Sequence, residues 1–219
     1  MIDLTRCRLY GIIDLGYINA SRAVRTAKAM IEGGVDLIQL RGKERPINAL
    51  FDLAARLHEV TSAASVPLIV NDHAEIARKV PVEGVHLGQD DDSIVVAREK
   101  AGRDMVVGKS THSLVQARAA AHEGADYIGF GPLYATPTKP DYQPIGLGDI
   151  AQVHADVTVP IFCIGGIKLE NLPDVLAAGA RRVVIVSGLL QASDIVKYAR
   201  EAKRALARIK PQTSPLKHS

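Results

Sequence analysis

Eight short apolar runs alternate along this chain with stretches of helical periodicity, and this alternation constrains the fold more than any other feature. Most of the runs are continuously apolar, which is typical of strands that are covered on both faces. Short connections between strands and helices favour parallel strands joined by right-handed crossovers. We expect strands at Leu9–Asp14, Leu37–Arg41, Leu68–Asp72, Val85–Gln89, Met105–Ser110, Tyr127–Pro132, Ile161–Gly165 and Val183–Ser187.

Eight such units in one chain of 219 residues close most naturally as a barrel. We therefore predict an α/β fold, a single-domain (β/α)8 TIM barrel over residues 1–210, with an open doubly wound sheet as the alternative. Residues 211–219 are predicted to form a disordered tail. Amphipathic helices are expected around Ala23–Ile31, Asn48–Val60, Ser113–Glu123 and Asn171–Ala178.

The composition excludes several classes of protein. Apolar residues make up 47% of the chain, but aromatic residues make up only 4%, which argues against stacking surfaces for single-stranded nucleic acid. Two cysteines do not make a disulfide framework. The sequence contains neither a recognisable signal peptide nor an apolar run near the roughly 20 residues of a membrane span. We expect a cytoplasmic protein without nucleic-acid or membrane partners.

Small residues follow the last two predicted strands. Gly165-Gly166 ends one strand and Ser187-Gly188 ends the next, so backbone amides at both places can approach an anion closely. In a parallel barrel all strands end on the face that carries the active site. The pair of motifs therefore predicts a phosphate-binding site, although a Gly-Gly pair alone is equally typical of a tight turn.

Cationic side chains follow the second predicted strand and lie in a long loop. Gln39, Arg41 and Lys43 recur with period two, and an Arg fork beside a Lys point charge suits a diphosphate. The alternative is a solvated charged loop. The loop 133–146 carries Thr136-Pro137-Thr138-Lys139, which either binds phosphate or forms a surface turn stiffened by Pro.

Two aspartates, Asp72 and Asp91, lie at the ends of adjacent predicted strands, which are spaced by roughly 4.8 Å. Carboxylates so placed repel each other unless a cation or a proton lies between them. Oxygen ligands without clustered Cys or His favour Mg²⁺ shared with a substrate phosphate. Alternatively each Asp caps the helix that follows it, and Asp90 and Asp92 compete with Asp91 as metal ligands. His86 is interpreted as a core or lumen residue.

Taken in order, these motifs resemble those of the thiamine-phosphate synthase family. The resemblance covers the chain from about Arg8 to Ala207, and eight motifs in the same order are specific although each one alone is weak. The family joins a hydroxymethylpyrimidine diphosphate to a thiazole phosphate, and it releases diphosphate and thiamine phosphate. The motifs are Gln39–Lys43, Asn71-Asp72, His86–Asp91, Gly108–His112, Asp126–Pro132, Thr136–Lys139, Ile164–Ile167 and Val186-Ser187.

The resemblance implies an Mg²⁺-dependent transferase of thiamine biosynthesis and a role for each matching residue. Asp72 and Asp91 would hold Mg²⁺. The hydroxymethylpyrimidine diphosphate would be bound by Gln39, Leu40, Arg41, Gly42, Lys43, Asn71, Ser110 and Lys139. The thiazole phosphate would be bound by Thr136, Pro137, Thr138, Gly166, Val186 and Ser187. Catalysis would rest on Arg41, Lys43, Ser110 and Lys139.

Other functions stay open for a barrel of this kind. A thiazole tautomerase would lack the metal chemistry, and the intact diphosphate and metal residues argue against it. A phosphosugar isomerase or aldolase needs a Lys or Glu base in the site, and the sixth predicted strand carries no lysine. A non-catalytic sensor of a phosphorylated ligand is the third alternative. A homo-oligomer remains an alternative to a monomer.

Overall fold

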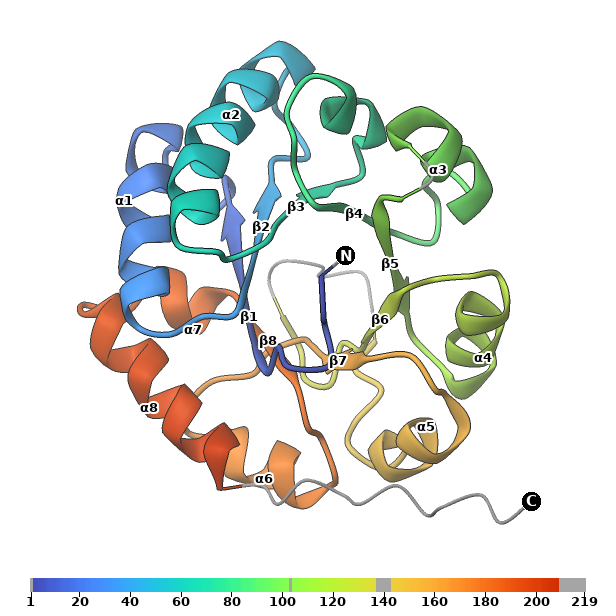
Figure 1. Cartoon of the computed structure of the whole chain (residues 1–219). Helices are drawn as coiled ribbons and strands as arrows, with labels where there is room; N and C mark the ends of the chain where they lie inside the picture. Colours follow the sequence, from blue (N-terminus) through green and yellow to red (C-terminus); the bar gives the residue numbers. More distant parts are fainter. Residues whose placement is uncertain (1, 103, 137–142, 209–219) are drawn as a thin grey trace.

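The computed structural model describes residues 2–102, 104–136 and 143–208, and it forms a closed barrel of eight parallel strands (Figure 1). Each strand pairs with the next in sequence order, and β8 pairs with β1. The predicted barrel is therefore confirmed, and the open sheet is excluded; the predicted tail, 211–219, lies outside the described residues. The strands are β1 (Leu9–Asp14), β2 (Leu37–Arg41), β3 (Leu68–Asn71), β4 (Gly84–Leu87), β5 (Val106–Thr111), β6 (Tyr127–Phe130), β7 (Ile161–Cys163) and β8 (Val183–Ile185).

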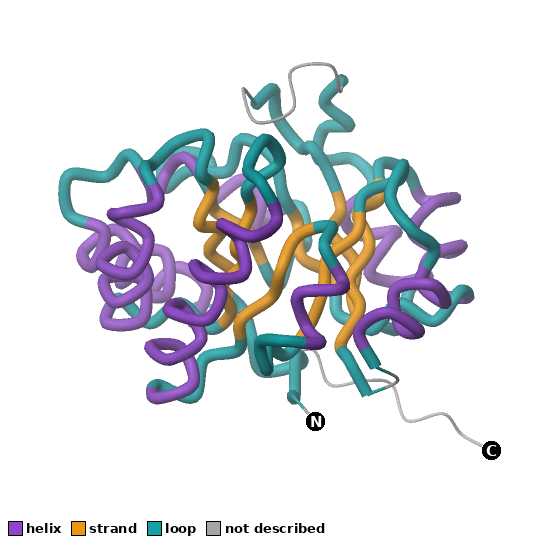
Figure 2. The backbone as a smooth tube through the Cα atoms, turned by 90° about the horizontal axis from the view of Figure 1, so that it is seen from above, coloured by secondary structure: helices purple, strands orange, loops and turns teal. Residues whose placement is uncertain are grey.

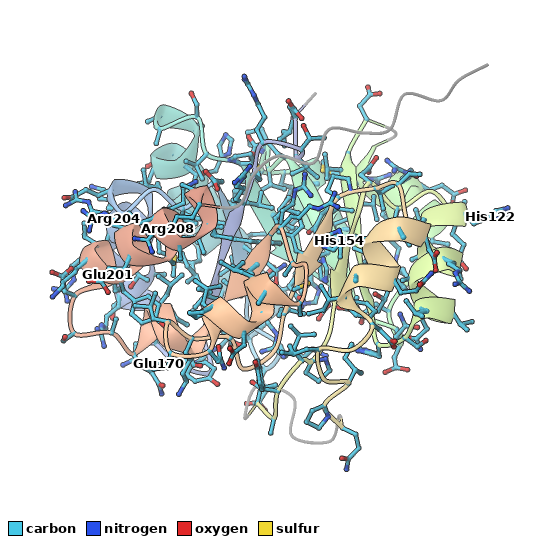
Figure 3. The ribbon with its side chains drawn as sticks, turned by 90° about the horizontal axis from the view of Figure 1, so that it is seen from below. His122, His154, Glu170, Glu201, Arg204 and Arg208 are labelled. Carbon is cyan, nitrogen blue, oxygen red and sulfur yellow. The ribbon has the colours of Figure 1, made fainter. Side chains whose placement is uncertain are left out.

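Helices surround the barrel and cover the outer faces of its strands (Figure 1). The segment after β3 forms a short 3-10 helix, η1 (Ala74–Arg78). In α8 the buried face consists of Ala199, Ala202 and Leu206, while Arg204 and Arg208 are exposed (Figure 3). The α-helices are α1 (Ala20–Glu32), α2 (Ile47–Ala63), α3 (Ile94–Ala101), α4 (Leu114–His122), α5 (Ile150–Asp156), α6 (Leu172–Ala177), α7 (Ser187–Leu190) and α8 (Ile195–Ala207).

Several strands end earlier than the apolar runs predict. β3 stops at Asn71 and β7 at Cys163, because the backbone then turns into loops at the open end of the barrel. Asp72 has a φ of 65° and Gly165 a φ of 101°, values of the left-handed region that no strand residue adopts. The loop segments on both sides of residues 137–142 stand at the end opposite to the N-terminus (Figure 2).

The core has two layers, which follow from the alternation of side chains along each strand. Outward residues such as Leu9 and Ile13 pack against the helices. Inward residues fill the barrel itself, where Tyr10, Tyr127 and Phe162 meet edge to face with ring centroids 5.4 to 6.1 Å apart. This inner layer forms a packed floor beneath the open end.

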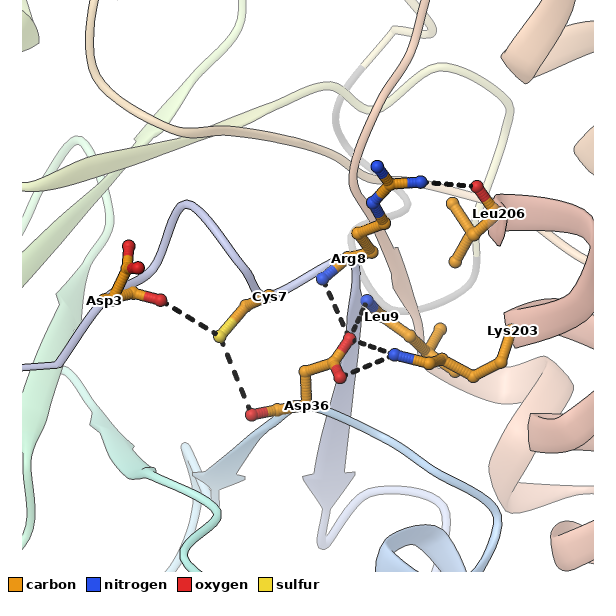
Figure 4. A network of polar contacts seen from close by, with 7 residues as sticks. All are labelled: Asp3, Cys7, Arg8, Leu9, Asp36, Lys203 and Leu206. Carbon is orange, nitrogen blue, oxygen red and sulfur yellow. Dashed lines mark hydrogen bonds and ion pairs between the residues drawn. The ribbon is translucent and has the colours of Figure 1, made fainter. Parts of the chain in front are cut away.

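Polar contacts fasten the amino-terminal end of the barrel (Figure 4). Asp36, which precedes β2, accepts hydrogen bonds from the backbone amides of Arg8 and Leu9 at 2.8 and 2.9 Å. Lys203 of α8 donates to both oxygens of the same carboxylate, at 2.5 and 2.7 Å. Arg8 in turn donates to the backbone oxygen of Leu206 at 2.8 Å. The last helix is thereby tied to the first two strands.

Candidate active site

A cavity of about 890 Å³, measured with its open mouth, lies at the carboxyl ends of the strands. Side chains from loops and strands all around the barrel line it, as expected for the functional face of this fold. Ten of the residues predicted for the site line the cavity: Gln39, Arg41, Lys43, Asn71, Asp72, Ser110, Thr136, Gly166, Val186 and Ser187.

Leu40 and Gly42 are not among the lining residues. Leu40 points outward from β2 and is buried in the layer between strands and helices, so only its backbone could reach a ligand. A Cβ at Gly42 would meet the Leu50 side chain at 2.8 Å. Pro137, Thr138 and Lys139 lie outside the described residues, and their roles stay predictions from the resemblance.

Arg41 is held in the cavity wall by Asp14, the last residue of β1. Its Nη1 lies 2.6 Å from Asp14 Oδ2, and the other carboxylate oxygen accepts from the Gly16 amide at 2.9 Å. Asp14 is only 2% exposed, so the pair is poorly screened by water. The guanidinium therefore has a fixed orientation toward the cavity, and four of its five N–H donors remain for a ligand or other contacts.

Asp72 and Asp91 approach each other closely, as their positions at the ends of β3 and after β4 predict. Burial, the hydrogen bond with Asp91 and the charge of Asp91 raise the pKa of Asp72 to about 6. Burial alone would raise the pKa of Asp91, but hydrogen bonds from Asp72 and the Gly88 amide and the charges of Lys43 and Lys109 lower it. Without a cation the two carboxyls share one proton at moderately acidic pH.

Neither aspartate caps a helix. Ser93 is the N-cap of α3 and accepts from the Val96 amide, and η1 begins without a side-chain cap. Asp90 is exposed, and Asp92 lies 2.6 Å from Lys100 Nζ in an ion pair. Asp91 is the residue of its run that contacts two cavity-lining residues: its Oδ2 accepts from the Gly88 amide at 2.6 Å, and its carboxyl group is hydrogen-bonded to that of Asp72.

The donor set of this carboxylate pair fits Mg²⁺ with substrate and water as further ligands. Two carboxylates are what Mg²⁺ commonly takes from a protein, and the substrate phosphates supply other oxygens. Within residues 2–102, 104–136 and 143–208, no group of three or more His, Cys, Asp or Glu side chains is placed to hold a metal ion. The close approach of the Asp72 and Asp91 carboxyl groups marks the position at which a cation would relieve their repulsion.

The loops after β7 and β8 form the opposite wall of the cavity. Gly166 has a φ of 65°, and a Cβ there would lie 2.7 Å from Tyr134 Cβ, so the loop after β6 packs directly on it. Asn171 fixes this turn by donating to the Gly166 backbone oxygen at 2.9 Å. Ser187 begins the short helix α7 and lines the same wall. The glycines thus form a tight turn that packs against the loop after β6 and lines the cavity.

Comparison with known proteins agrees with this geometry. Residues 9–189 match the family described as thiamine monophosphate synthase. The chain belongs to the thiamine monophosphate synthase family. It is 39% identical over 206 residues to the thiamine-phosphate synthase of Pelotomaculum thermopropionicum, with 94% of both chains covered. It is 42% identical over 189 residues to that of Halalkalibacterium halodurans, with 86% of this chain and 90% of the relative covered.

Solved structures share the fold of this chain. A thiamine phosphate pyrophosphorylase from Pyrococcus furiosus superposes with a TM-score of 0.83 at 29% identity, and the match covers 92% of this chain and 96% of that one. A 3-hexulose-6-phosphate synthase, with a TM-score of 0.66 and 20% identity, covers 91% of this chain and 99% of its own and shares the fold alone. No described helix is long and apolar enough to span a membrane.

Several cavity residues of this family member were not assigned from the sequence. Asp14 could have been found from its place at the end of the first strand, where it faces inward with Ile12 and Tyr10. His86 was interpreted as a core or lumen residue; it lines the cavity, with both ring nitrogens in hydrogen bonds to Tyr127 and Ser110. Apolar residues such as Ile164 and Val184 also line the cavity, and the sequence does not distinguish them from residues of the core.

Proposed function

We propose that this chain is a thiamine-phosphate synthase that couples hydroxymethylpyrimidine diphosphate with thiazole phosphate in an Mg²⁺-dependent reaction. The observation that carries the proposal is one cavity that is lined both by cationic side chains and by the small residues of two strand ends. Arg41, Lys43 and the Asp72–Asp91 pair lie on one side, and Gly166 and Ser187 lie on the other. Such an arrangement supports two phosphorylated substrates bound side by side. We further propose a cytoplasmic location and small molecules as the only substrates.

The chain's own residues stabilise the leaving group. When the C–O bond of the pyrimidine diphosphate breaks, the electron pair stays on the diphosphate and negative charge grows there. Arg41, oriented by Asp14, offers a fixed positive charge at that place, and Lys43 adds a second positive charge from an exposed side chain. Lys139 is proposed for the same role on the family resemblance. Bound Mg²⁺, held by Asp72 and Asp91, would supply electrophilic assistance to the diphosphate.

The second half of the reaction requires positioning more than chemistry. Loss of diphosphate leaves a pyrimidine methylene cation, and the thiazole nitrogen donates its electron pair to form the new C–N bond. The wall with Gly166 and Ser187 would hold the thiazole phosphate at the required distance and angle. No protein nucleophile is needed, and β6 offers none, because its residues are Tyr127-Ile-Gly-Phe130. The lack of a lysine there also argues against an aldolase reaction.

The direct test is an assay with purified protein, both substrates and Mg²⁺. Thiamine phosphate should form, and omission of either substrate or chelation of the metal should abolish it. A non-catalytic phosphate sensor would bind the thiazole phosphate without forming product, and a tautomerase would not consume the diphosphate substrate. Either of these results would sink the proposed activity.

A further inference from the structure

A chain of hydrogen bonds crosses the floor of the cavity. Gln39 Nε2 donates to the Tyr10 hydroxyl at 2.6 Å, and the Tyr10 and Tyr127 hydroxyls are 3.1 Å apart. Tyr127 OH lies 3.0 Å from His86 Nδ1, and His86 Nε2 lies 3.0 Å from Ser110 Oγ. This series of hydrogen bonds therefore connects β2 with β5. It runs through Tyr10, Tyr127 and His86, to which the proposed function gives no role.

The rings that carry this chain are held firmly. Tyr10 and Tyr127 are 1% and 0% exposed, and both pack edge to face against Phe162. Gly108 on β5 makes room for the Tyr127 ring, since a Cβ at that position would overlap the ring atoms Cζ and Cε1. Burial raises the pKa of Tyr10 and that of Tyr127, so both phenols keep their hydrogens at neutral pH. Each hydroxyl therefore has one hydrogen to donate.

The direction of the hydrogen bonds in this series follows from the first donor, the side-chain amide of Gln39. The Gln39 amide nitrogen only donates, so the Tyr10 oxygen accepts. In the part of the chain that the structure describes, the Tyr10 hydroxyl contacts two hydrogen-bonding groups, Gln39 Nε2 and Tyr127 OH. The Tyr10 hydrogen thus goes to Tyr127, and the Tyr127 hydrogen goes to His86 Nδ1. A neutral imidazole that accepts at Nδ1 carries its hydrogen on Nε2, and it donates to Ser110 Oγ.

The opposite direction is less favourable. If His86 donated from Nδ1 to Tyr127, the Tyr127 hydrogen would point at the Tyr10 oxygen. The Tyr10 hydrogen would then lack an acceptor among the described residues in a position that is 1% exposed. A buried hydroxyl hydrogen without an acceptor is unfavourable, because the hydrogen bond that it makes with water is lost and not replaced.

We propose that Tyr10, Tyr127 and His86 form a one-way relay that fixes His86 as the Nε2–H tautomer and leaves the Ser110 hydroxyl hydrogen to be donated into the cavity. The relay makes these three residues positioning residues for Gln39 and Ser110. Resting on the proposed function, the inference makes Ser110 a hydrogen-bond donor to the pyrimidine diphosphate. An acceptor on that substrate would gain a hydrogen bond whose direction is set before binding.

The tautomer is measurable without any substrate. Protein labelled with ¹⁵N-histidine, in mildly alkaline solution, gives separate signals for protonated and bare ring nitrogens, and the His86→Gln variant assigns those of His86. We expect the hydrogen on Nε2 in the unchanged protein. A hydrogen on Nδ1 would overturn the relay. This result stands apart from the proposed function, because it is obtained whether or not the protein forms thiamine phosphate.

Kinetics tests whether the relay acts through Ser110. Tyr127→Phe keeps the ring and removes the middle hydroxyl, and we expect kcat to fall about tenfold with little change in KM for the thiazole phosphate. In a Ser110→Ala background the same change should alter kcat by less than about twofold, because the two residues act as one unit. Additive losses would show that Tyr127 acts independently of Ser110 and would refute the relay.

A matched control removes a buried hydroxyl far from the cavity. Thr61 on α2 is 0% exposed, and its hydroxyl donates to the His58 backbone oxygen at 3.3 Å. Thr61→Val should leave kcat and the His86 tautomer unchanged. A tenfold loss in this variant as well would mean that kcat reports general destabilisation, and the kinetic support for the relay would fail.

Discussion

The two ends of the barrel treat their charged side chains in opposite ways. At the amino-terminal end Asp36 is surrounded by two backbone amides and Lys203, so its charge is fully compensated within the protein (Figure 4). At the carboxyl end Asp72 faces another carboxylate, and its backbone adopts the left-handed φ of 65°. Like charges and an unusual backbone conformation both oppose folding.

This difference separates stability from function. Charges that are satisfied internally, as around Asp36, have no capacity left for a ligand. Charges that repel each other, as in Asp72 and Asp91, gain free energy when a cation or substrate arrives. The glycine turn at Gly165 and Gly166 also lies beside the cavity, and its positive φ values let the backbone pack closely against the loop after β6. The carboxyl end is therefore stabilised by its ligands, and the amino-terminal end stabilises the fold without them.

The largest effect is expected from Asp72→Asn. The amide keeps the size of the side chain and tolerates the left-handed backbone, but it removes the charge that would hold Mg²⁺. We expect kcat to fall by about a hundredfold or more, while the melting temperature of the metal-free protein stays equal or rises. Asp90→Asn, at an exposed neighbour of Asp91, is the control and should retain full activity. Near-normal kcat in Asp72→Asn would remove this residue from the metal site.

A change at the amino-terminal end of the barrel should lower stability and leave activity unchanged. Asp36→Ala removes the acceptor of the Arg8 and Leu9 amides and the partner of Lys203. We expect the free energy of unfolding to fall by about 2 kcal/mol, with kcat unchanged at temperatures where the protein stays folded. Denaturant titration measures the first quantity and a substrate assay the second. Glu32→Ala, in an exposed pair with Arg200, should shift stability by less than about 0.5 kcal/mol.

A substitution with a smaller effect can distinguish the two proposed binding sites of the cavity. Ser187→Ala removes one hydroxyl from the wall after β8. We expect KM for the thiazole phosphate to rise up to about tenfold and KM for the pyrimidine diphosphate to change less. Steady-state kinetics with each substrate varied in turn gives both values. The reverse order would exchange the two pockets.

The smallest effect concerns pH and the metal-free protein. The pKa of Asp72 is raised from 3.8 to about 6, so the folded state binds the proton more tightly than the unfolded chain. This contribution to stability is fully present below pH 3.8 and is lost as pH rises through about 6. We expect part of the fall in melting temperature over that window to disappear in Asp72→Asn and on adding Mg²⁺. If the melting temperatures of the unchanged protein and of Asp72→Asn depend on pH in the same way, Asp72 and Asp91 do not share a proton.

Much of this architecture could be predicted from the sequence, because the signals are local. Continuous apolar runs mark the strands, and polar residues at their carboxyl ends, such as Arg41 and Asp72, must meet on one face of a parallel barrel. The period of two along β2 places Leu40 on the opposite face from Gln39 and Arg41, although the family resemblance includes it among the substrate-binding residues. The strands predicted at β3 and β7 extend too far, because the pattern of apolar residues does not show where the backbone leaves the extended conformation, as it does at Asp72.

The remaining features depend on contacts between strands, either neighbouring ones or ones that face each other across the barrel. The pairing of Asp14 with Arg41 and the relay from Tyr10 through Tyr127 to His86 join residues of β1, β2, β4 and β6. Periodicity shows which side chains point into the barrel, but it does not show which of them meet across it. Similarly, the role of Gly108 becomes visible only with the Tyr127 ring beside it.

The most direct test of the central claim follows both phosphorus-containing products in one sample. Phosphorus NMR of the protein with hydroxymethylpyrimidine diphosphate, thiazole phosphate and Mg²⁺ resolves free diphosphate from thiamine phosphate. We expect one diphosphate to appear for each thiamine phosphate, and none to appear when the thiazole phosphate is withheld for the same time. Release of diphosphate at an equal rate without the thiazole phosphate, or no release with both substrates present, would contradict the two-anion site.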